Sequence, residues 1–337
     1  MNTRLFVTIA TAALILAGCT NDENGTDNGP VKIRLTSGVE VQQPRASTTL
    51  TQSTSITAGE VVSVWVDDAG TMSDPTPLYE ANQLTVTAQN GFSGSDMFFP
   101  KTGNKVNIYA VHGNFITPFK AGDALPTAAG VEYKVEADQS EGGAAYTNSD
   151  LLYAYKKDVS RNGNPTEVQL TFYHMLSKLE LAIVKGEGAP ELASTGAVKL
   201  NGVTLKGNFT PSTSVDMSDQ SKRADMLSDA STTATGDMTL GQTICTDFTD
   251  PNVEYNEAIL VPQDMIDKVL TFTLKDGGTL KYTIPAFDAT PGAAVFESGK
   301  KYQYHITLNL TGLKVTSTIK DWEEVGDKPV PGKAEMD

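Results

Sequence analysis

Apolar and polar residues alternate along much of this chain, which is the pattern of strands that bury one face in a sheet. The pattern is clearest near the N-terminus, where Val31, Ile33 and Leu35 share one parity and Val39 and Val41 continue it. The positions between them hold polar or charged residues or glycine. The sequence therefore predicts an amphipathic strand over residues 31–41.

Similar segments recur through the whole chain. Further strands are expected at residues 61–66, 84–87, 106–111, 168–172, 179–184, 198–205, 258–261, 270–274, 280–284, 302–310 and 313–319. Helical periodicity is confined to a short helix over 264–270 and one turn over 174–178. Asp276-Gly277-Gly278 predicts a hairpin turn, and residues 211–241, rich in Ser, Thr and Asp, predict a long exposed loop. Many short strands separated by turn residues indicate an all-β fold of sandwich type.

The chain length suggests how these strands are grouped. A chain of 337 residues is too long for one ordinary core and about right for two domains. The strand pattern breaks near the middle, where Lys185 to Pro190 reads Lys-Gly-Glu-Gly-Ala-Pro. We therefore expect two tandem β-sandwich domains, at residues 31–187 and 188–337.

The N-terminus has the features of a signal peptide. Leu5 to Leu16 is an uncharged, largely apolar run, shorter than the roughly 20 residues that span a bilayer. It ends in Leu16-Ala17-Gly18-Cys19, which resembles a lipobox. Residues 1–18 are therefore expected to be removed and Cys19 lipidated, with residues 19–30 as a polar tether to the outer membrane. The alternative is a plain signal peptide followed by an incidental cysteine.

Net charge and cysteine content exclude other classes of protein. A formal net charge of -15 argues against nucleic-acid binding and suits a surface protein. The chain has 2 cysteines. If Cys19 carries lipid, Cys245 has no partner for an internal disulfide, and we expect it to be a buried structural residue.

The residue types that support catalysis or cofactor binding do not gather into a known motif. The 3 histidines, His112, His174 and His305, have no second His or Cys at metal-ligand spacing, so we expect no metal and no cofactor. Nucleophile-elbow, P-loop and dinucleotide motifs are also missing from the sequence, so we expect no enzyme. Trp65 and Trp322 could stack on sugars, but valines flank Trp65, which favours a place in the core.

Seven segments, in order and behind the lipobox, resemble the fimbrillin-like family of type V pilus subunits. The resemblance spans residues 19–322. The segments are Ala58-Gly59-Glu60-Val61-Val62-Ser63-Val64-Trp65, Phe98-Phe99-Pro100 followed by Val106 to Val111, Asp150-Leu151-Leu152-Tyr153-Ala154, Phe172-Tyr173-His174-Met175-Leu176-Ser177-Lys178-Leu179, Ile259-Leu260-Val261-Pro262-Gln263, Gly299-Lys300-Lys301-Tyr302-Gln303-Tyr304-His305-Ile306 and Ile319-Lys320-Asp321-Trp322.

The resemblance implies a fold and a route of assembly. It implies two β-sandwich domains of transthyretin-like topology, delivered to the outer membrane as a lipoprotein. An Arg-specific protease then removes the N-terminal segment with its first strand, and a strand from a neighbouring subunit fills the exposed groove. On this scheme the chain is a structural or adhesive subunit of cell-surface type V fimbriae that binds other pilus subunits and, through its adhesive role, a host or bacterial surface ligand.

Residues 31–57 fit that scheme. Pro44-Arg45-Ala46 follows the expected strand and favours extended backbone, so the expected cut lies between Arg45 and Ala46, and the N-terminal domain would then begin at residue 46. Arg34 is a poorer site because it lies inside the strand. Loss of Val31 to Val41 would leave unpaired edges and an apolar slot that a partner strand can fill. The alternative for Arg45 is an ordinary solvated loop residue.

The C-terminal region departs from the pattern of a stalk subunit, which donates an apolar strand from near its C-terminus. The last 15 residues are polar and carry Pro329 and Pro331. Only Leu313, Val315 and Ile319 alternate suitably for a donor strand, so a tip, accessory or anchor subunit fits as well as a stalk subunit. The alternative function is a lipid-anchored surface glycan-binding protein that stays monomeric.

Overall fold

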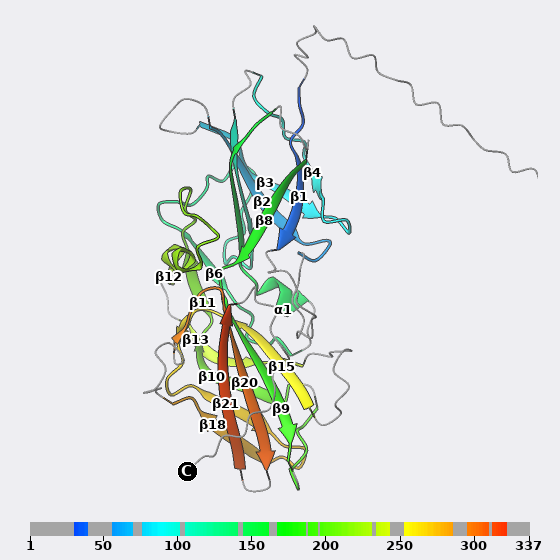
Figure 1. Ribbon diagram of the computed structural model, residues 1–337, viewed down its shortest axis with the longest axis vertical. Helices are drawn as coiled ribbons and strands as arrows, with labels where there is room; N and C mark the ends of the chain where they lie inside the picture. The colour runs from blue at the N-terminus through cyan, green and yellow to red at the C-terminus, as the bar shows by residue number, and fades with distance from the viewer. Residues whose placement is uncertain are drawn as a thin grey trace, which may run out of the picture.

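The protein folds into two lobes stacked along the long axis of the molecule, and nearly all of its regular structure is strand (Figure 1). The computed structural model describes residues 30–39, 56–69, 76–101, 105–140, 144–161, 167–186, 188–194, 196–230, 234–242, 253–285, 295–309 and 312–321. The expected all-β, sandwich-type fold is confirmed, whereas the transthyretin-like strand order stays a prediction. Among the described helices, none has the length and apolar character needed to cross a membrane.

The N-terminal lobe is built on a seven-stranded sheet in the order β1-β8-β7-β5-β2-β3-β4. Its strands are β1 (Arg34–Val39), β2 (Val61–Asp68), β3 (Thr76–Val86), β4 (Phe92–Gly94), β5 (Val106–His112), β7 (Leu152–Val159) and β8 (Glu167–His174). β2 is buried at successive positions from Val62 to Val66, because both of its faces are covered. Val62, Val64 and Val66 lie in the core of this lobe, whereas Trp65 joins a cluster that continues into the second lobe.

The C-terminal lobe packs a five-stranded sheet, β14-β15-β9-β20-β21, against a four-stranded sheet, β13-β10-β17-β18. The strands are β9 (Ser177–Lys185), β10 (Val198–Thr204), β13 (Thr235–Thr239), β14 (Gly241–Gln242), β15 (Val253–Leu260), β17 (Val269–Thr273), β18 (Thr279–Thr283), β20 (Lys300–Asn309) and β21 (Gly312–Asp321). β16 (Gln263–Asp264) and β19 (Val295–Phe296) form a small separate pair. The expected hairpin at residues 276–278 is confirmed, since β17 and β18 pair antiparallel across it and Gly277 has φ 89°.

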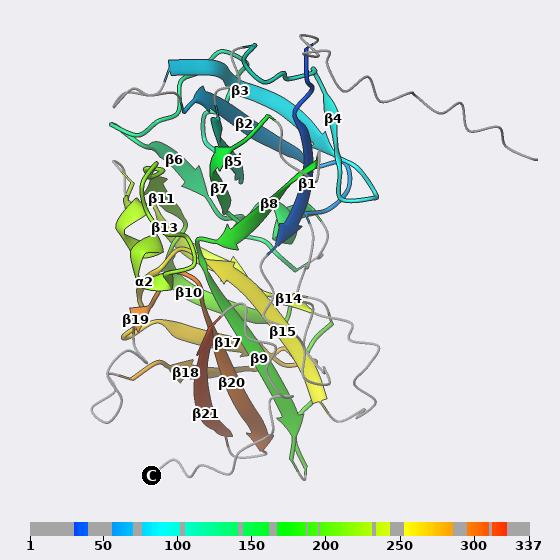
Figure 2. The ribbon, with the colours of Figure 1, turned by 45° about the horizontal axis from the view of Figure 1, so that its top comes forward.

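A small sheet joins the two lobes. β6 (Val131–Lys134) comes from the first half of the chain and pairs antiparallel with β11 (Lys206–Phe209), which pairs in turn with β12 (Leu227–Asp229). Figure 2 shows β6 and β11 side by side at the waist of the molecule. The helical elements are α1 (Ala144–Asn148), α2 (Gln220–Arg223) and the 3-10 turn η1 (Ala224–Met226). One apolar cluster runs through this region, so the two lobes share part of their core.

The structure differs from the sequence expectations at three places. β8 ends at His174 and β9 begins at Ser177, so the turn of helix expected over 174–178 is wrong, and the chain changes sheet ahead of the expected boundary at 187–188. The helix expected over 264–270 is also wrong. The Asp264 carboxylate accepts the backbone N–H of Ile266 at 2.9 Å, which favours a turn over a helix, and β17 then pairs with β10.

The segment 211–241 is the third place. It holds α2, η1, β12 and β13 rather than one long loop. Its polar composition hides these elements, because they are short and only a few of their residues, such as Met226 and Met238, are buried.

Candidate strand-exchange groove

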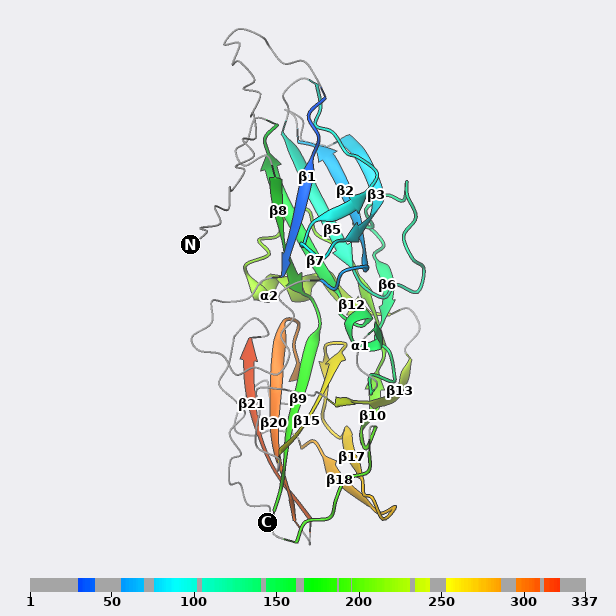
Figure 3. The same ribbon diagram turned by 90° about the vertical axis from the view of Figure 1, so that its right-hand side faces the viewer.

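β1 lies at one edge of the N-terminal sheet and pairs in parallel with β8. The register joins Arg34 with Glu167 and continues through six pairs to Val39 with Phe172. In Figure 3 the two strands run side by side down the face of the lobe. This pairing confirms a strand over most of residues 31–39, the described part of the segment that the alternation predicts.

Residues 90–99 hold the other side of β1. The N–H of Ile33 donates to the carbonyl of Met97 at 2.8 Å, and the N–H of Ser37 donates to the carbonyl of Asn90 at 2.7 Å. The N–H of Phe99 donates in the opposite direction, to the carbonyl of Val31, at 2.9 Å. β1 therefore fills a gap between β8 and residues 90–99, with backbone hydrogen bonds to both walls. We call this gap the β1 groove.

The apolar side chains of residues 33–39, the segment that ends with β1, point into the core of the lobe. Ile33, Leu35 and Val39 are 3%, 8% and 7% exposed and pack in one cluster with residues of β2, β5 and β8. Burial of such a side chain contributes about 1.5–3 kcal/mol, so these three are a substantial part of the stability of the lobe. Lys32 and Arg34 point outward, and Lys32 forms an exposed ion pair with Asp96.

A cavity of about 710 Å³ lies beside β1 along one wall of the β1 groove. Residues of β1, among them Leu35, line one side, and Phe92, Met97 and their neighbours line the other. The wall formed by residues 90–99 is thus in contact with β1 only in part. Such an arrangement lets a strand be replaced by another with different side chains more readily than a fully packed core does.

Comparison with known proteins identifies the family. Residues 45–322 match the family model described as fimbrillin-like. The chain belongs to the fimbrillin-like family. A Bacteroides uniformis protein named as a candidate fimbrium subunit, Fim1C, is 23% identical to this fimbrillin-like chain over 336 residues, which cover 96% of each chain.

Solved structures show the same fold. A candidate cell adhesion protein from Bacteroides uniformis gives a TM-score of 0.58 at 20% identity and covers 87% of this chain and 99% of its own. One from Bacteroides ovatus gives a TM-score of 0.58 at 17% identity and covers 87% and 98%. Membership of the family makes the chain a cell-surface fimbrial or adhesion subunit, in a family that is structural rather than enzymatic and whose members associate with other pilus subunits.

The candidate donor strand of this fimbrillin-like chain is part of its own C-terminal sheet. β21 pairs antiparallel with β20 at ten successive positions, from Gly312 with Asn309 to Asp321 with Lys300. Leu313 is 6% exposed and Val315 packs against the core, whereas the side chain of Ile319 lies outside the described ones. β21 is an edge strand, so the side away from β20 has no strand partner in the described sheet.

Several expected site residues lie outside the residues that the structure describes. They are Cys19, Val41, Arg45 and Ala46, together with Cys245 and Trp322. Lipidation at Cys19 and cleavage between Arg45 and Ala46 therefore stay predictions. Trp65 is confirmed as a core residue, because it is 1% exposed and its indole N–H donates to the carbonyl of Asp123 at 2.8 Å.

The sequence did not reveal which residues form the second wall of the β1 groove. Phe98-Phe99 belongs to one of the segments that resemble the family, and it lies in this wall. Nothing in the local sequence pattern indicates that Phe99 contacts residue 31. His112 and His174 lie at the ends of β5 and β8, and His305 lies in β20. Across the described parts of the chain, no three His, Cys, Asp or Glu side chains gather in a way that could hold a metal ion.

Proposed function

We propose that this chain is a subunit of type V fimbriae that is assembled by strand exchange. The precursor would reach the outer membrane through lipid on Cys19. Cleavage between Arg45 and Ala46 would then release residues 19–45, and with them β1. A strand from a neighbouring subunit would enter the β1 groove and make the same two sets of backbone hydrogen bonds.

One observation carries this proposal: β1 fills a gap between two walls of its lobe and comes first among the described strands. Its C-terminal end leads into residues 40–55, which contain Arg45, and the described chain resumes at Ile56, 5% exposed in the same core. A cut at Arg45 therefore detaches β1 and leaves every other described strand intact. The lobe would be left with two unpaired walls and an apolar slot, an unstable condition that strand addition relieves.

We further propose that the subunit accepts a strand but retains β21. Donation would break ten residue pairs with β20 and expose Leu313, whereas β1 has six pairs with β8, and residues 31–37 have three backbone bonds to the other wall. A β21 that left β20 for the β1 groove of another subunit would give up the longer ladder for the shorter one, which is unfavourable. A subunit that accepts and does not donate belongs at one end of a fibre.

The cleavage step is tested by intact-mass measurement of surface protein from wild type and from Arg45→Ala. We expect the wild-type mass to begin at Ala46 and the Arg45→Ala mass to retain lipid and β1. Arg34→Ala is the matched control, since Arg34 is the other arginine near the site, and it should be cleaved as wild type is. Wild-type surface protein that retains residues 31–41 would overturn the proposal and favour an uncleaved anchor.

The groove is tested separately by adding back the strand. A peptide of residues 30–42 should bind the purified chain that begins at Ala46 and raise its melting temperature, because a ligand that binds only the folded state stabilises it. The control peptide carries Ile33→Asp, Leu35→Asp and Val39→Asp and should not bind. Equal effects of the two peptides would show that the groove does not recognise an alternating apolar strand.

A further inference from the structure

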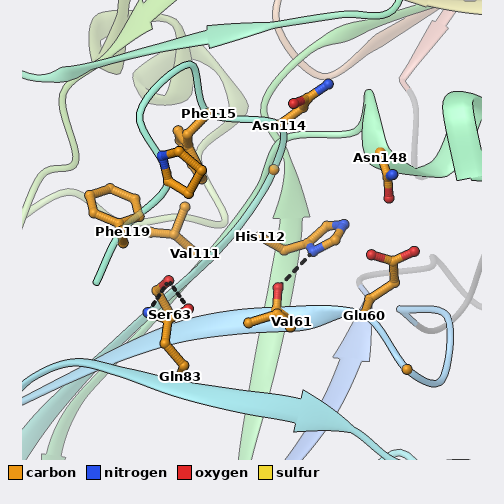
Figure 4. Close-up of a pocket in the computed structure, with 13 residues that line it drawn as sticks. Glu60, Val61, Ser63, Gln83, Val111, His112, Asn114, Phe115, Phe119 and Asn148 are labelled. Carbon is orange, nitrogen blue, oxygen red and sulfur yellow. Dashed lines mark hydrogen bonds between the residues drawn. The ribbon is translucent and has the colours of Figure 1, made fainter. Parts of the chain in front are cut away.

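A second concavity lies in the N-terminal lobe and shares no lining residue with the cavity beside β1. It has a volume of about 280 Å³ and lies among the start of β2, the end of β5, the loop that follows β5, and α1. Figure 4 shows Glu60, His112 and Asn148 on one side of it and Phe115 and Phe119 on the other. We call this concavity, with these five lining residues, the His112 pocket.

His112 is 5% exposed and presents a hydrogen-bond acceptor to the pocket. Its Nδ1 lies 3.1 Å from the carbonyl oxygen of Val61. A carbonyl only accepts, so Nδ1 carries the hydrogen, and in the neutral form of imidazole Nε2 is then an acceptor. The described residues form no hydrogen bond with Nε2. The contact with Val61 fixes the imidazole ring and leaves Nε2 available to a ligand that donates a hydrogen bond.

Glu60 and Asn148 supply the remaining polar groups of that wall. Both side chains are half-buried, and neither forms a side-chain hydrogen bond or ion pair among the described residues. In Figure 4 the carboxylate of Glu60 and the amide of Asn148 converge on the space beside the His112 ring. The wall thus offers two acceptors, the His112 nitrogen and the Glu60 carboxylate, together with an amide that both donates and accepts.

The opposite wall is apolar and held in place by packing. Phe119 packs edge-on against Trp65, with ring centroids 5.0 Å apart, and against Phe115, with centroids 4.8 Å apart. Trp65 is itself fixed by its hydrogen bond to the Asp123 carbonyl. The aromatic wall is therefore formed before a ligand arrives, which lowers the entropic cost of binding.

We propose that the His112 pocket binds a single sugar residue, such as the terminal unit of a surface glycan. A pyranose has hydroxyl groups that donate to His112 and Glu60 and accept from Asn148, and a C–H face that packs on Phe119. The volume lies just under the roughly 300–1,000 Å³ of pockets for drug-sized ligands, which suits one ring rather than a chain of sugars. The proposal concerns recognition of a ligand and does not depend on strand exchange.

The nearest rival ligand is an ammonium group, which Glu60 and an aromatic ring could also hold. An ammonium group has three donors and no acceptor. It could bond to the oxygen of the Asn148 amide, but it would leave the N–H groups of that amide without a partner on the ligand. A hydroxyl group uses donors and acceptors alike, so the mixed wall fits a sugar better.

The test titrates free N-acetylglucosamine, galactose, mannose and fucose into the purified protein and follows the sugar signals by NMR. We expect at least one sugar to bind with a dissociation constant on the order of 1 mM, as weak as is usual for so small a ligand. Glu60→Gln and Asn148→Ala should each weaken that binding at least about fivefold, which corresponds to the loss of one hydrogen bond. Both side chains are half-buried and unbonded, so the melting temperature should hold.

Glu167→Gln is the matched control, because it removes the same charge from an exposed position of β8 outside the His112 pocket. Its sugar affinity should equal that of wild type. The proposal is overturned if none of the four sugars binds at about 10 mM, a concentration well above the expected constant. It is equally overturned if the two pocket variants bind as wild type does, or if methylammonium binds and the sugars do not.

Discussion

At the scale of single residues, the most unusual feature of this subunit is a set of buried charges in its C-terminal sheet. Lys178, Glu180, Glu257 and Lys301 are 5% exposed or less. The Nζ atom of Lys178 lies 3.0 Å from a carboxylate oxygen of Glu180 and 2.8 Å from one of Glu257. Gln303 donates to Glu180 at 2.8 Å. Two positive and two negative charges balance within the sheet, and we call them the buried charge cluster.

The buried charge cluster makes stability depend on pH in a definite direction. Burial by itself raises the pKa of Glu180, but the charges of Lys178 and Lys301 outweigh it, and the pKa lies below its ordinary value of 4.5. A carboxylate with a lowered folded-state pKa contributes stability that is present above the unfolded-state pKa and lost as pH falls through the folded one. The free energy of unfolding should therefore decrease once the pH drops below about 4.5, because Glu180 takes up a proton.

Replacement of Lys178 by Met should destabilise the protein strongly. It removes the central cation and leaves two buried carboxylates with Lys301 as the one cation of the cluster, and loss of one partner from a buried ion pair costs about 3–5 kcal/mol in comparable cases. Urea unfolding at neutral pH measures the loss. Lys275→Met is the matched control, since Lys275 pairs with Glu191 at 2.7 Å on the surface, where both side chains are more than half exposed, and such pairs contribute about 0–1 kcal/mol. Equal losses in the two variants would contradict the role of the buried charge cluster.

At the scale of elements, the two edge strands β1 and β21 differ in what they would lose by leaving. β1 has a parallel ladder of six pairs and a second wall that contacts it in part, whereas β21 has an antiparallel ladder of ten pairs. Only β1 lies next to a segment that carries a candidate cleavage site. A disulfide that fixes β1 should therefore affect assembly, whereas one that fixes β21 should not.

Two disulfide variants test this difference. Thr36→Cys with Gln169→Cys joins register partners of β1 and β8, and Thr307→Cys with Lys314→Cys joins partners of β20 and β21. Neighbouring strands lie about 4.7–4.9 Å apart, so the Cα atoms of register partners come within the range that a disulfide spans. In a Cys245→Ser background, we expect the first lock to block incorporation into fibres, measured by immunogold labelling, and the second to leave it unchanged.

Reduction serves as the internal control, because a reducing agent should restore incorporation of the β1-locked protein. If the β20–β21 disulfide blocks incorporation and the β1–β8 disulfide does not, then β21 is the strand that moves. Stalk-like donation would then replace the end-of-fibre position proposed above.

At the scale of the whole molecule, the lobes are joined by strand pairing and a common core rather than by a linker alone. Gly207 of β11 is the register partner of Tyr133 of β6, and the Tyr133 ring covers the place where a side chain at 207 would lie. Tyr133 is fully buried. The joint therefore depends on the absence of a side chain at this one position.

Gly207→Val should loosen this joint. The added side chain collides with the Tyr133 ring, and overpacking of this kind costs about 1–3 kcal/mol. We expect calorimetry to show one transition for wild type and two for the variant, as the lobes begin to unfold separately. Asn208→Val, at a half-exposed position of the same strand, should keep the single transition. A single transition in Gly207→Val would show that the lobes are coupled by other contacts.

Local alternation in the sequence is enough to predict which residues of these strands face the core. The alternation of Ile33 and Leu35 with Lys32 and Arg34 predicted burial that the structure confirms, and the flanking valines predicted the core position of Trp65. These are local properties, because the side-chain period of a strand follows from its backbone. The family was also identifiable from short segments that keep their order along the chain.

The choice of neighbour for each strand, in contrast, is visible only in the folded protein. Pairing of β1 with β8 and with residues 90–99, of β6 with β11, and of Lys178 with Glu257 joins residues far apart in the chain. The His112 pocket likewise combines Glu60 with Asn148. Alternation fixes the buried face of a strand but carries no information about its partner, since any strand with an apolar face of similar length could fill the same place.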